Sequence, residues 1–233
     1  MSMIAIKDLH KFYGEGSGRA EVLKGITCDI EEGEICVLLG PSGSGKSTVL
    51  NAIGGIEPID AGDVVVGGTS LSSLSSKALS LYRRDSLGFV FQFYNLVPNL
   101  TAKENIEVGA YLSKNPLPLD NLLHTLGLWE HRNKLPSQLS GGQQQRCSIG
   151  RALIKNPLVL LCDEPTGALD YNTSKEILSL IESVNRQFHT TVILVTHNEA
   201  IKGIAHRVMK LRDGLITENT CNDNRIPAHD LIW

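Results

Sequence analysis

Residues 40–48 have the types and the spacing of a loop that binds phosphate. They read G-P-S-G-S-G-K-S-T, match the pattern G-x-x-x-x-G-K-S, and stand between an apolar strand-like run and a helical run. Glycine lets the backbone curl with its N–H groups inward, and a helix N-terminus offers further unpaired N–H groups to an anion. In this pattern Lys46 reaches the β- and γ-phosphates of a nucleotide, and the hydroxyl of Ser47 binds Mg²⁺. A structural glycine-rich turn is the alternative. The predicted phosphate-binding residues are Gly40, Pro41, Ser42, Gly43, Ser44, Gly45, Lys46, Ser47 and Thr48.

Two adjacent carboxylates, Asp163 and Glu164, end the apolar run of residues 158–162. Successive side chains of a strand face opposite ways, which predicts different roles for the two acids. We expect Asp163 to hold Mg²⁺, directly or through water. We expect Glu164 to face the γ-phosphate and to act as general base on the attacking water. A solvated pair of acids at a strand end is the alternative.

Gln92 and His197 end two further apolar runs, residues 87–92 and 191–197. Ligands of a parallel sheet collect at the carboxyl ends of its strands. Gln92 is therefore expected at the metal or the attacking water, and His197 is expected to donate to the γ-phosphate and to position the water. Taken alone, each has an ordinary alternative, a loop hydrogen bond for the glutamine and a structural role for the histidine.

A second anion site is predicted where Ser140, Gly141, Gly142 and Gln143 begin a helical run, because this turn offers the same kind of N–H groups and dipole. One nucleotide does not need two such sites from one chain. The surplus indicates either a second ligand or a γ-phosphate shared with another copy of the protein.

Tyr13 precedes the loop of residues 14–18 and offers a flat ring on which a purine could stack. The alternative is a tyrosine at a strand edge that packs on its neighbours.

The elements that must position these residues follow from hydrophobic periodicity. Residues 4–9 and 23–30 alternate like antiparallel strands, residues 62–68 form a short strand and turn, residues 72–86 have a helical pattern, and Asp213-Gly214 closes a hairpin. Strand signals disappear from residue 93 to 157, where helical periods and a capping box at Thr101 and Glu104 take over. We predict an α/β fold in a single domain of residues 1–233. Residues 1–92 and 158–233 form the core, a mostly parallel sheet flanked by helices with an N-terminal antiparallel β subdomain, and residues 93–157 form a helical subdomain.

Residues 93–98 are apolar and aromatic, and core packing or a docking groove for a partner explains them equally.

Composition narrows the class of protein. The chain has 233 residues, 42% of them apolar, and a net charge of −3, with neither a basic footprint for nucleic acid nor a polybasic membrane patch. No signal peptide and no apolar run of the ~18 residues that a membrane span needs is visible. Five cysteines without a C-x-x-C pair indicate a reducing cytosol, and Cys36 and Cys162 are expected to be buried apolar residues. No role is predicted for residues 219–233.

Taken together, these motifs resemble the nucleotide-binding subunits of ATP-binding-cassette transporters over nearly the whole chain. Seven motifs occur in the family's order, including a signature sequence of residues 139–143, which begins with Leu139, and a D-loop of residues 167–170 that ends in Asp170. The resemblance implies ATP and Mg²⁺ as ligands and an integral membrane permease as partner. It implies a cytoplasmic subunit on the inner face of the plasma membrane. It also implies that two copies pair head to tail, so that each signature sequence closes on the partner's ATP, which would explain the second anion site.

Residues 91–98 and 100–105 are similar to the branch that includes lipoprotein-release, macrolide-export and bacitracin-type peptide-resistance ATPases. This similarity implies an exporter or extractor of amphipathic substrates. The alternative is a cell-division type of ATPase that signals through a membrane partner to a cell-wall hydrolase without transport. A soluble ATPase of DNA repair or translation would show a long coiled coil or a second cassette, and the sequence shows neither. Ser148 and Gly150 replace more usual alanines, which predicts a softer helix there, and Gly167 replaces a more usual serine.

Overall fold

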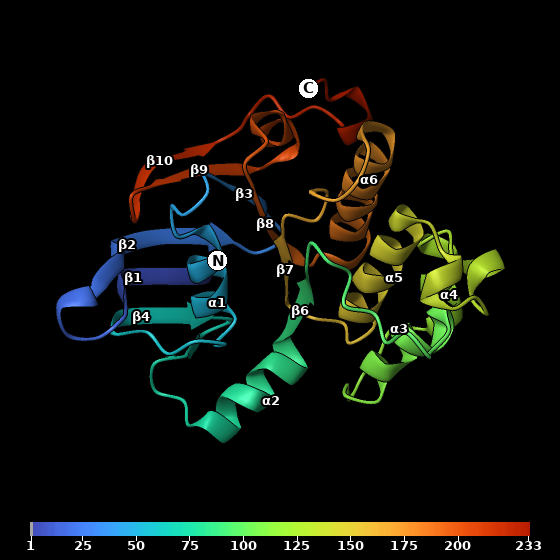
Figure 1. Cartoon of the computed structure of the whole chain (residues 1–233), viewed down its shortest axis with the longest axis horizontal. Helices are drawn as coiled ribbons and strands as arrows, with labels where there is room; N and C mark the ends of the chain where they lie inside the picture. Colours follow the sequence, from blue (N-terminus) through green and yellow to red (C-terminus); the bar gives the residue numbers. More distant parts are fainter. Residues whose placement is uncertain (1) are drawn as a thin grey trace.

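The computed structural model describes residues 2–233 and contains two sheets that share one core (Figure 1). Met1, the first residue of the predicted core of residues 1–92 and 158–233, lies outside the described residues. The smaller sheet is antiparallel and has the strand order β2-β1-β4-β5. Its strands are β1 (Ser2–Tyr13), β2 (Ala20–Glu31), β4 (Ala61–Val66) and β5 (Thr69–Ser70). The predicted antiparallel beginning is confirmed, although β1 and β2 are longer than their apolar patterns suggested.

The larger sheet has the order β10-β9-β3-β8-β7-β6, and all neighbours pair in parallel except β10 with β9. Its strands are β3 (Ile35–Leu39), β6 (Leu87–Val90), β7 (Val159–Asp163), β8 (Thr191–Thr196), β9 (Arg207–Arg212) and β10 (Leu215–Cys221). Every residue of β3 and β8 is buried, as expected for a parallel sheet covered on both faces. The predicted α/β fold and the hairpin at Asp213-Gly214 are confirmed.

Helix α1 (Lys46–Ile53) fills the space between the two sheets. Its Val49 and Leu50 pack with Ile4 and Ile6 of β1 and with Leu38 of β3 in one hydrophobic cluster. Neighbouring residues of β3 point to the opposite face, where α5 (Gly141–Leu153) and α6 (Tyr171–Phe188) cover the sheet. This arrangement holds the start of α1 at the carboxyl end of β3.

The predicted helical subdomain is confirmed, and residues 93–157 of the described chain contain no strand. Besides α5 it holds α3 (Ala102–Ala110), α4 (Leu119–Thr125) and the short 3₁₀ helices η2 (Trp129–His131) and η3 (Pro136–Gln138). The Thr101 and Glu104 capping box is present, because each side chain accepts from the backbone N–H of the other. Figure 1 shows this subdomain on the far side of the sheet from β1, with α2 (Ser76–Ser86) below both.

Gly150 has a packing role that the sequence did not predict. A Cβ added there would lie 2.5 Å from Leu126 Cδ1 and 2.8 Å from Ile106 Cδ1. The glycine therefore lets α5 approach α3 and the end of α4 closely, whereas the sequence suggested only a softer helix.

The segment after β10 also packs on the body of the protein. Ala228 and Leu231 are buried, Tyr171 Oη donates to the backbone oxygen of Leu231 at 3.1 Å, and the Trp233 ring meets the Tyr171 ring edge-on at 4.9 Å. Of residues 219–233, which had no predicted role, residues 219–221 thus belong to β10, and residues 228–233 pack on α6. Cys28, Cys36, Cys147 and Cys162 are buried, as predicted for Cys36 and Cys162, while Cys221 is exposed. Among residues 2–233, no helix combines the length and apolar composition that a membrane crossing requires.

Candidate functional site

The loop between β3 and α1 has the backbone geometry of an anion cradle. Gly43 and Gly45 have φ values of 78° and 102°, a left-handed conformation that favours glycine. A Cβ at Gly40 would lie 2.3 Å from the backbone oxygen of Leu211, so no larger residue fits there. The Ser44 hydroxyl is buried without a hydrogen-bond partner inside this loop. The loop therefore holds unpartnered polar groups at the N-terminus of a helix, where an anion is favoured.

Lys46 is already aimed at this loop. Its side chain is largely buried, and its Nζ donates to the backbone oxygens of Gly40 at 2.8 Å and Pro41 at 2.9 Å. These two neutral acceptors hold the ammonium over the cradle without cancelling its charge. A phosphate in the cradle would offer the ammonium a stronger, charged acceptor.

A hydrogen bond joins the phosphate loop to the end of β7. Ser47 Oγ donates to Asp163 Oδ1 at 3.3 Å. Burial raises the pKa of the Asp163 carboxyl above its usual value, the bond from Ser47 opposes that shift, and the charge of Glu164 adds to it. A hydroxyl and a carboxylate side by side are hard oxygen donors, the kind that Mg²⁺ takes together with phosphate oxygens. These two residues therefore fit the predicted metal site.

Glu164 is oriented by its backbone and by His197. It has a φ of 48°, and its N–H donates to the backbone oxygen of Val195 at 3.0 Å. Because β7 ends at Asp163, strand alternation does not reach Glu164, and our sequence argument from alternation is wrong on this point. The two acids nevertheless meet different partners: Asp163 contacts Ser47, and Glu164 Oε1 lies 2.9 Å from His197 Nδ1. Glu164 is mostly shielded from solvent, whereas the His197 side chain is 67% exposed and open to a ligand.

Gln92 lies two residues beyond the end of β6, which stops at Val90 and not at Gln92 as the apolar run suggested. A Cβ at Gly167 would lie 2.9 Å from Gln92 Nε2, so the glycine leaves room for this amide against the D-loop. This contact gives a physical reason for glycine at position 167. No hydrogen bond joins Gln92 to Ser47 or Asp163 within residues 2–233, and its role at the metal remains a prediction.

Sequence reasoning missed Gln145, which connects α5 to the segments that carry Glu164 and Gln92. Its Nε2 donates to the backbone oxygen of Pro165 at 2.9 Å and lies 3.5 Å from that of Phe91. These are the residues next to Glu164 and Gln92. Gln145 is fully buried and lies on the helix stripe formed with Gly142, Ile149 and Ala152. A polar residue on a buried stripe is a signal that the sequence carried, at a spacing of three to four residues.

The second predicted anion site begins a well-capped helix. Ser140 Oγ accepts from the N–H of Gln143 at 3.3 Å, and Gln143 Oε1 accepts from the N–H of Ser140 at 3.0 Å. Gly142 is also required by packing, because a Cβ there would lie 2.5 Å from Thr173 Cγ2. No hydrogen bond or ion pair joins residues 140–143 to residues 40–48 in the part of the chain described. Figure 1 shows α1 and α5 on opposite sides of β6 and β7.

Asp170 and Tyr13 complete the predicted set. Asp170 caps α6: its carboxylate accepts from the Thr173 N–H at 3.0 Å and the Thr173 hydroxyl at 2.6 Å, and these bonds lower its pKa. Tyr13 ends β1, is 40% exposed, and donates its hydroxyl to Glu57. No hydrogen bond or ion pair joins Asp170 to the phosphate loop among residues 2–233.

Comparisons with known proteins agree with this geometry. A family model described as ABC transporter matches residues 23–167. A putative ABC transporter ATP-binding protein of Mycoplasma pneumoniae is 42% identical over 99% of this chain and 50% of its own length. A macrolide export ATP-binding/permease protein of Escherichia coli is 41% identical over 93% of this chain and 34% of its own length. The chain thus spans about half or less of the length of these curated relatives.

Solved structures share the fold. One is an ATP-binding cassette in a dimeric, post-hydrolysis state bound to ADP and Pi, with 37% identity and a TM-score of 0.84 over 94% of this chain and 98% of that one. Another, from Clostridium perfringens, is described as part of an ABC transporter complex, with 27% identity and a TM-score of 0.84 over 94% of this chain and 88% of that one.

Proposed function

Because the chain belongs to the ABC transporter family, we propose that it binds ATP with Mg²⁺, hydrolyses the ATP, and thereby drives a permease embedded in the membrane. The observation that carries this proposal is the Ser47 to Asp163 hydrogen bond, which joins the phosphate loop to the strand end next to Glu164. The ADP and Pi bound by the similar cassette support the same reaction.

Binding follows from the loop. The N–H groups of the cradle and the start of α1 take the phosphates, and Lys46 turns from its two carbonyl acceptors to the β- and γ-phosphates. Ser47, Asp163 and Gln92 would hold Mg²⁺, which neutralises phosphate charge when bound.

Hydrolysis depends on the pair that Glu164 and His197 form. Glu164 accepts the proton of the water that attacks the γ-phosphorus, a contribution of about 10²–10⁴-fold for a general base. The 2.9 Å contact with His197 Nδ1 holds the carboxylate in one orientation. The exposed ring of His197 then faces the γ-phosphate and, as an imidazolium with both ring nitrogens protonated, donates to it from Nε2 while Nδ1 donates to Glu164.

A second copy of the chain would complete the site. Among residues 2–233, no hydrogen bond or ion pair joins residues 140–143 to their own phosphate loop, and two solved structures of one similar cassette are dimeric. We therefore assign Ser140, Gly141, Gly142 and Gln143 to the ATP of the partner in a head-to-tail dimer, with Asp170 at the same interface.

The membrane partner and its substrate are further parts of the proposal. Phe93 and Val97 follow Gln92 and are 72% and 43% exposed, which favours docking over core packing for these residues. A permease bound there would sense the catalytic loop directly. The relatives named for macrolide export support an exporter or extractor of amphipathic substrates, with this subunit on the cytoplasmic face of the plasma membrane.

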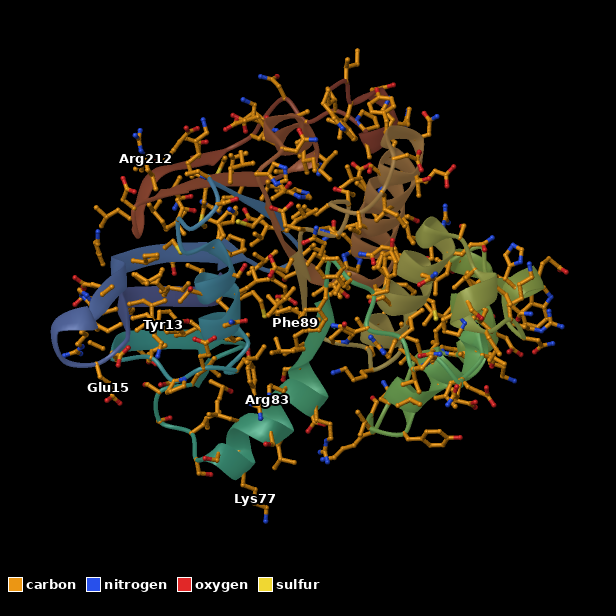
Figure 2. The ribbon with its side chains drawn as sticks, viewed as in Figure 1. Tyr13, Glu15, Lys77, Arg83, Phe89 and Arg212 are labelled. Atoms are coloured by element: carbon orange, nitrogen blue, oxygen red, sulfur yellow. The ribbon has the colours of Figure 1, made fainter. Side chains whose placement is uncertain are left out.

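Replacement of one lysine tests the core of the proposal. In Lys46→Ala the cradle loses the buried ammonium of Lys46, and we expect ATP affinity to fall by about 10-fold or more, with ATPase activity lost. Lys77→Ala is the matched control, since Lys77 lies exposed on α2 and points away from the site (Figure 2). Calorimetric titration with Mg-ATP measures the affinity. Equal affinity in wild type and Lys46→Ala would refute the cradle.

Purification of the chain from membranes tests the second part of the proposal. An integral membrane protein that co-purifies with wild type, and is lost after Phe93→Asp and Val97→Asp, supports the docking surface. The extracytoplasmic part of that membrane protein distinguishes the two candidate functions, export and signalling to a cell-wall hydrolase. A substrate cavity supports export, and a region that binds a cell-wall hydrolase supports signalling.

A further inference from the structure

Glu57 holds the aromatic ring of Tyr13, which lies at the end of β1. The Tyr13 hydroxyl donates to Glu57 Oε2, and the other oxygen, Glu57 Oε1, accepts from Asn51 Nδ2 at 2.8 Å. Asn51 belongs to α1, whose first residues are Lys46 and Ser47. Glu57 therefore connects the ring to the helix that begins at the phosphate loop. It joins this helix at Asn51, about 7.5 Å along the helix axis from Lys46.

The loop that carries Glu57 also fixes the main chain of β1. Asp60 accepts from the N–H of Phe12 at 2.8 Å and donates its own N–H to the backbone oxygen of His10 at 3.1 Å. Lys11 Nζ donates to the backbone oxygen of Pro58 at 2.7 Å. Residues 57–60 thus hold both the strand and the side chain at its end.

The Tyr13 ring is prepared to bind a flat ligand on one side. Lys11 Nζ lies over the ring at 5.3 Å from its centroid, which leaves the opposite face for a base. Burial and then the bond to Glu57 raise the pKa of the Tyr13 phenol, so the phenol stays protonated and keeps donating.

We propose that Glu57 is a positioning residue that orients the Tyr13 ring for the base of the nucleotide and couples that ring to the phosphate loop through Asn51. This inference rests on the proposed function, because it takes a nucleotide to occupy residues 40–48. The physical basis is preorganisation. A side chain that is already immobilised loses little conformational entropy when the base stacks on it.

A pair of probes separates the base from the phosphates. Mg-ATP uses both the ring and the cradle, whereas inorganic tripolyphosphate with Mg²⁺ uses only the cradle. We expect Tyr13→Phe and Glu57→Leu each to weaken Mg-ATP binding by about 3–10-fold, the range for one ordinary hydrogen bond. The affinity for tripolyphosphate should stay within about twofold of wild type, and the KM for ATP should rise while kcat is unchanged.

A double-mutant cycle tests the coupling. Since both single variants break the same bond, the double variant should bind Mg-ATP no more weakly than either single one. Glu57→Gln should restore most of the affinity, because its amide oxygen still accepts from the phenol and Asn51 can turn to accept from its amide nitrogen. Glu15→Leu is the matched control, since Glu15 is exposed on the hairpin loop near Tyr13 (Figure 2). Thermal melting confirms that each variant folds.

Two outcomes would overturn the inference. One is single effects that multiply in the double variant, and the other is a loss of tripolyphosphate binding equal to the loss of ATP binding. Tyr13→Ala distinguishes failure of the positioning role of Glu57 from failure of the proposed base site at the Tyr13 ring. If Tyr13→Ala leaves ATP affinity unchanged, the ring does not carry the base. If it weakens ATP binding while Tyr13→Phe and Glu57→Leu do not, only the positioning role of Glu57 is wrong.

Discussion

At the scale of single residues, backbone and side-chain contacts together orient Glu164 for its proposed role as general base. Its positive φ turns the carboxylate out of the strand direction, and the contact with His197 fixes it there. Glu164→Gln keeps the shape and removes the ability to take a proton. We expect Mg-ATP affinity to be retained, turnover to fall by about 10²–10⁴-fold, and an ATP-bound dimer to accumulate. Phosphate release and size-exclusion chromatography measure these effects. A Glu164→Gln protein that hydrolyses ATP normally would remove Glu164 from the mechanism.

Asp163 illustrates a charge that the proposed metal site requires and that burial disfavours. Because its folded-state pKa is raised, the carboxylate destabilises the nucleotide-free protein as pH rises above the pKa of the unfolded chain. We expect Asp163→Asn to have a higher Tm than wild type at neutral pH without ligands, and the difference to shrink as pH falls toward about 4. In the same variant Mg-ATP should no longer raise Tm as it does in wild type. Differential scanning calorimetry across pH checks both, and a lower Tm without ligands would contradict the sign.

At the scale of elements, α5 has a close packing contact at Gly150 and a buried hydroxyl without a hydrogen-bond partner at Ser148. Gly150→Ala improves helix propensity by about 1 kcal/mol, but its Cβ would meet Leu126 and Ile106, and overpacking costs about 1–3 kcal/mol. We expect a net loss of stability. Ser148→Ala is the matched variant on the same helix. The Ser148 hydroxyl is buried without a partner, and its removal should stabilise the protein by about 1 kcal/mol. Urea denaturation measures both changes, and a Gly150→Ala protein more stable than wild type would refute the packing account.

The elements themselves were largely predictable because their signals are local. An apolar run such as residues 35–39, the capping box of Thr101, and the turn at Asp213-Gly214 each depend on neighbours in sequence. Element ends were less predictable. The apolar pattern of residues 87–92 predicted a strand that extends to Gln92, whereas β6 ends at Val90. The packing of residues 228–233 on α6 had no local signal, since it depends on a tertiary contact with Tyr171.

At the scale of the whole molecule, the fold explains why the site residues could be found but their partners could not. Ser47, Asp163, Glu164 and His197 follow or end strands of one sheet, and the rule that ligands gather at that edge places them together. Their pairing depends on side-chain geometry, such as the contact of Glu164 with His197, which no spacing encodes. The bond from Tyr13 to Glu57 spans 44 positions and joins the end of β1 to a loop, so it could be identified only in the folded chain.

The dimer is the last property of the whole molecule, and a mixing experiment decides it. Ser140 caps α5, and among residues 2–233 no hydrogen bond or ion pair joins it to its own phosphate loop, so we expect the N–H groups at the start of α5 to act on ATP that a second copy brings. Ser140→Arg should leave ATP affinity of the monomer within about twofold and abolish turnover, because the bulky cation blocks closure on the partner. Mixed with Lys46→Ala, it should regain turnover. The mixed dimer has one site made of an intact phosphate loop and an intact signature sequence, and the other site carries both changes. ATPase activity against mixing ratio should therefore pass through a maximum near equal amounts, reaching at most about one quarter of the wild-type rate if copies pair at random and each site works independently. If the mixture stays inactive although size-exclusion chromatography shows mixed dimers, Ser140 acts within its own chain and the head-to-tail arrangement is wrong.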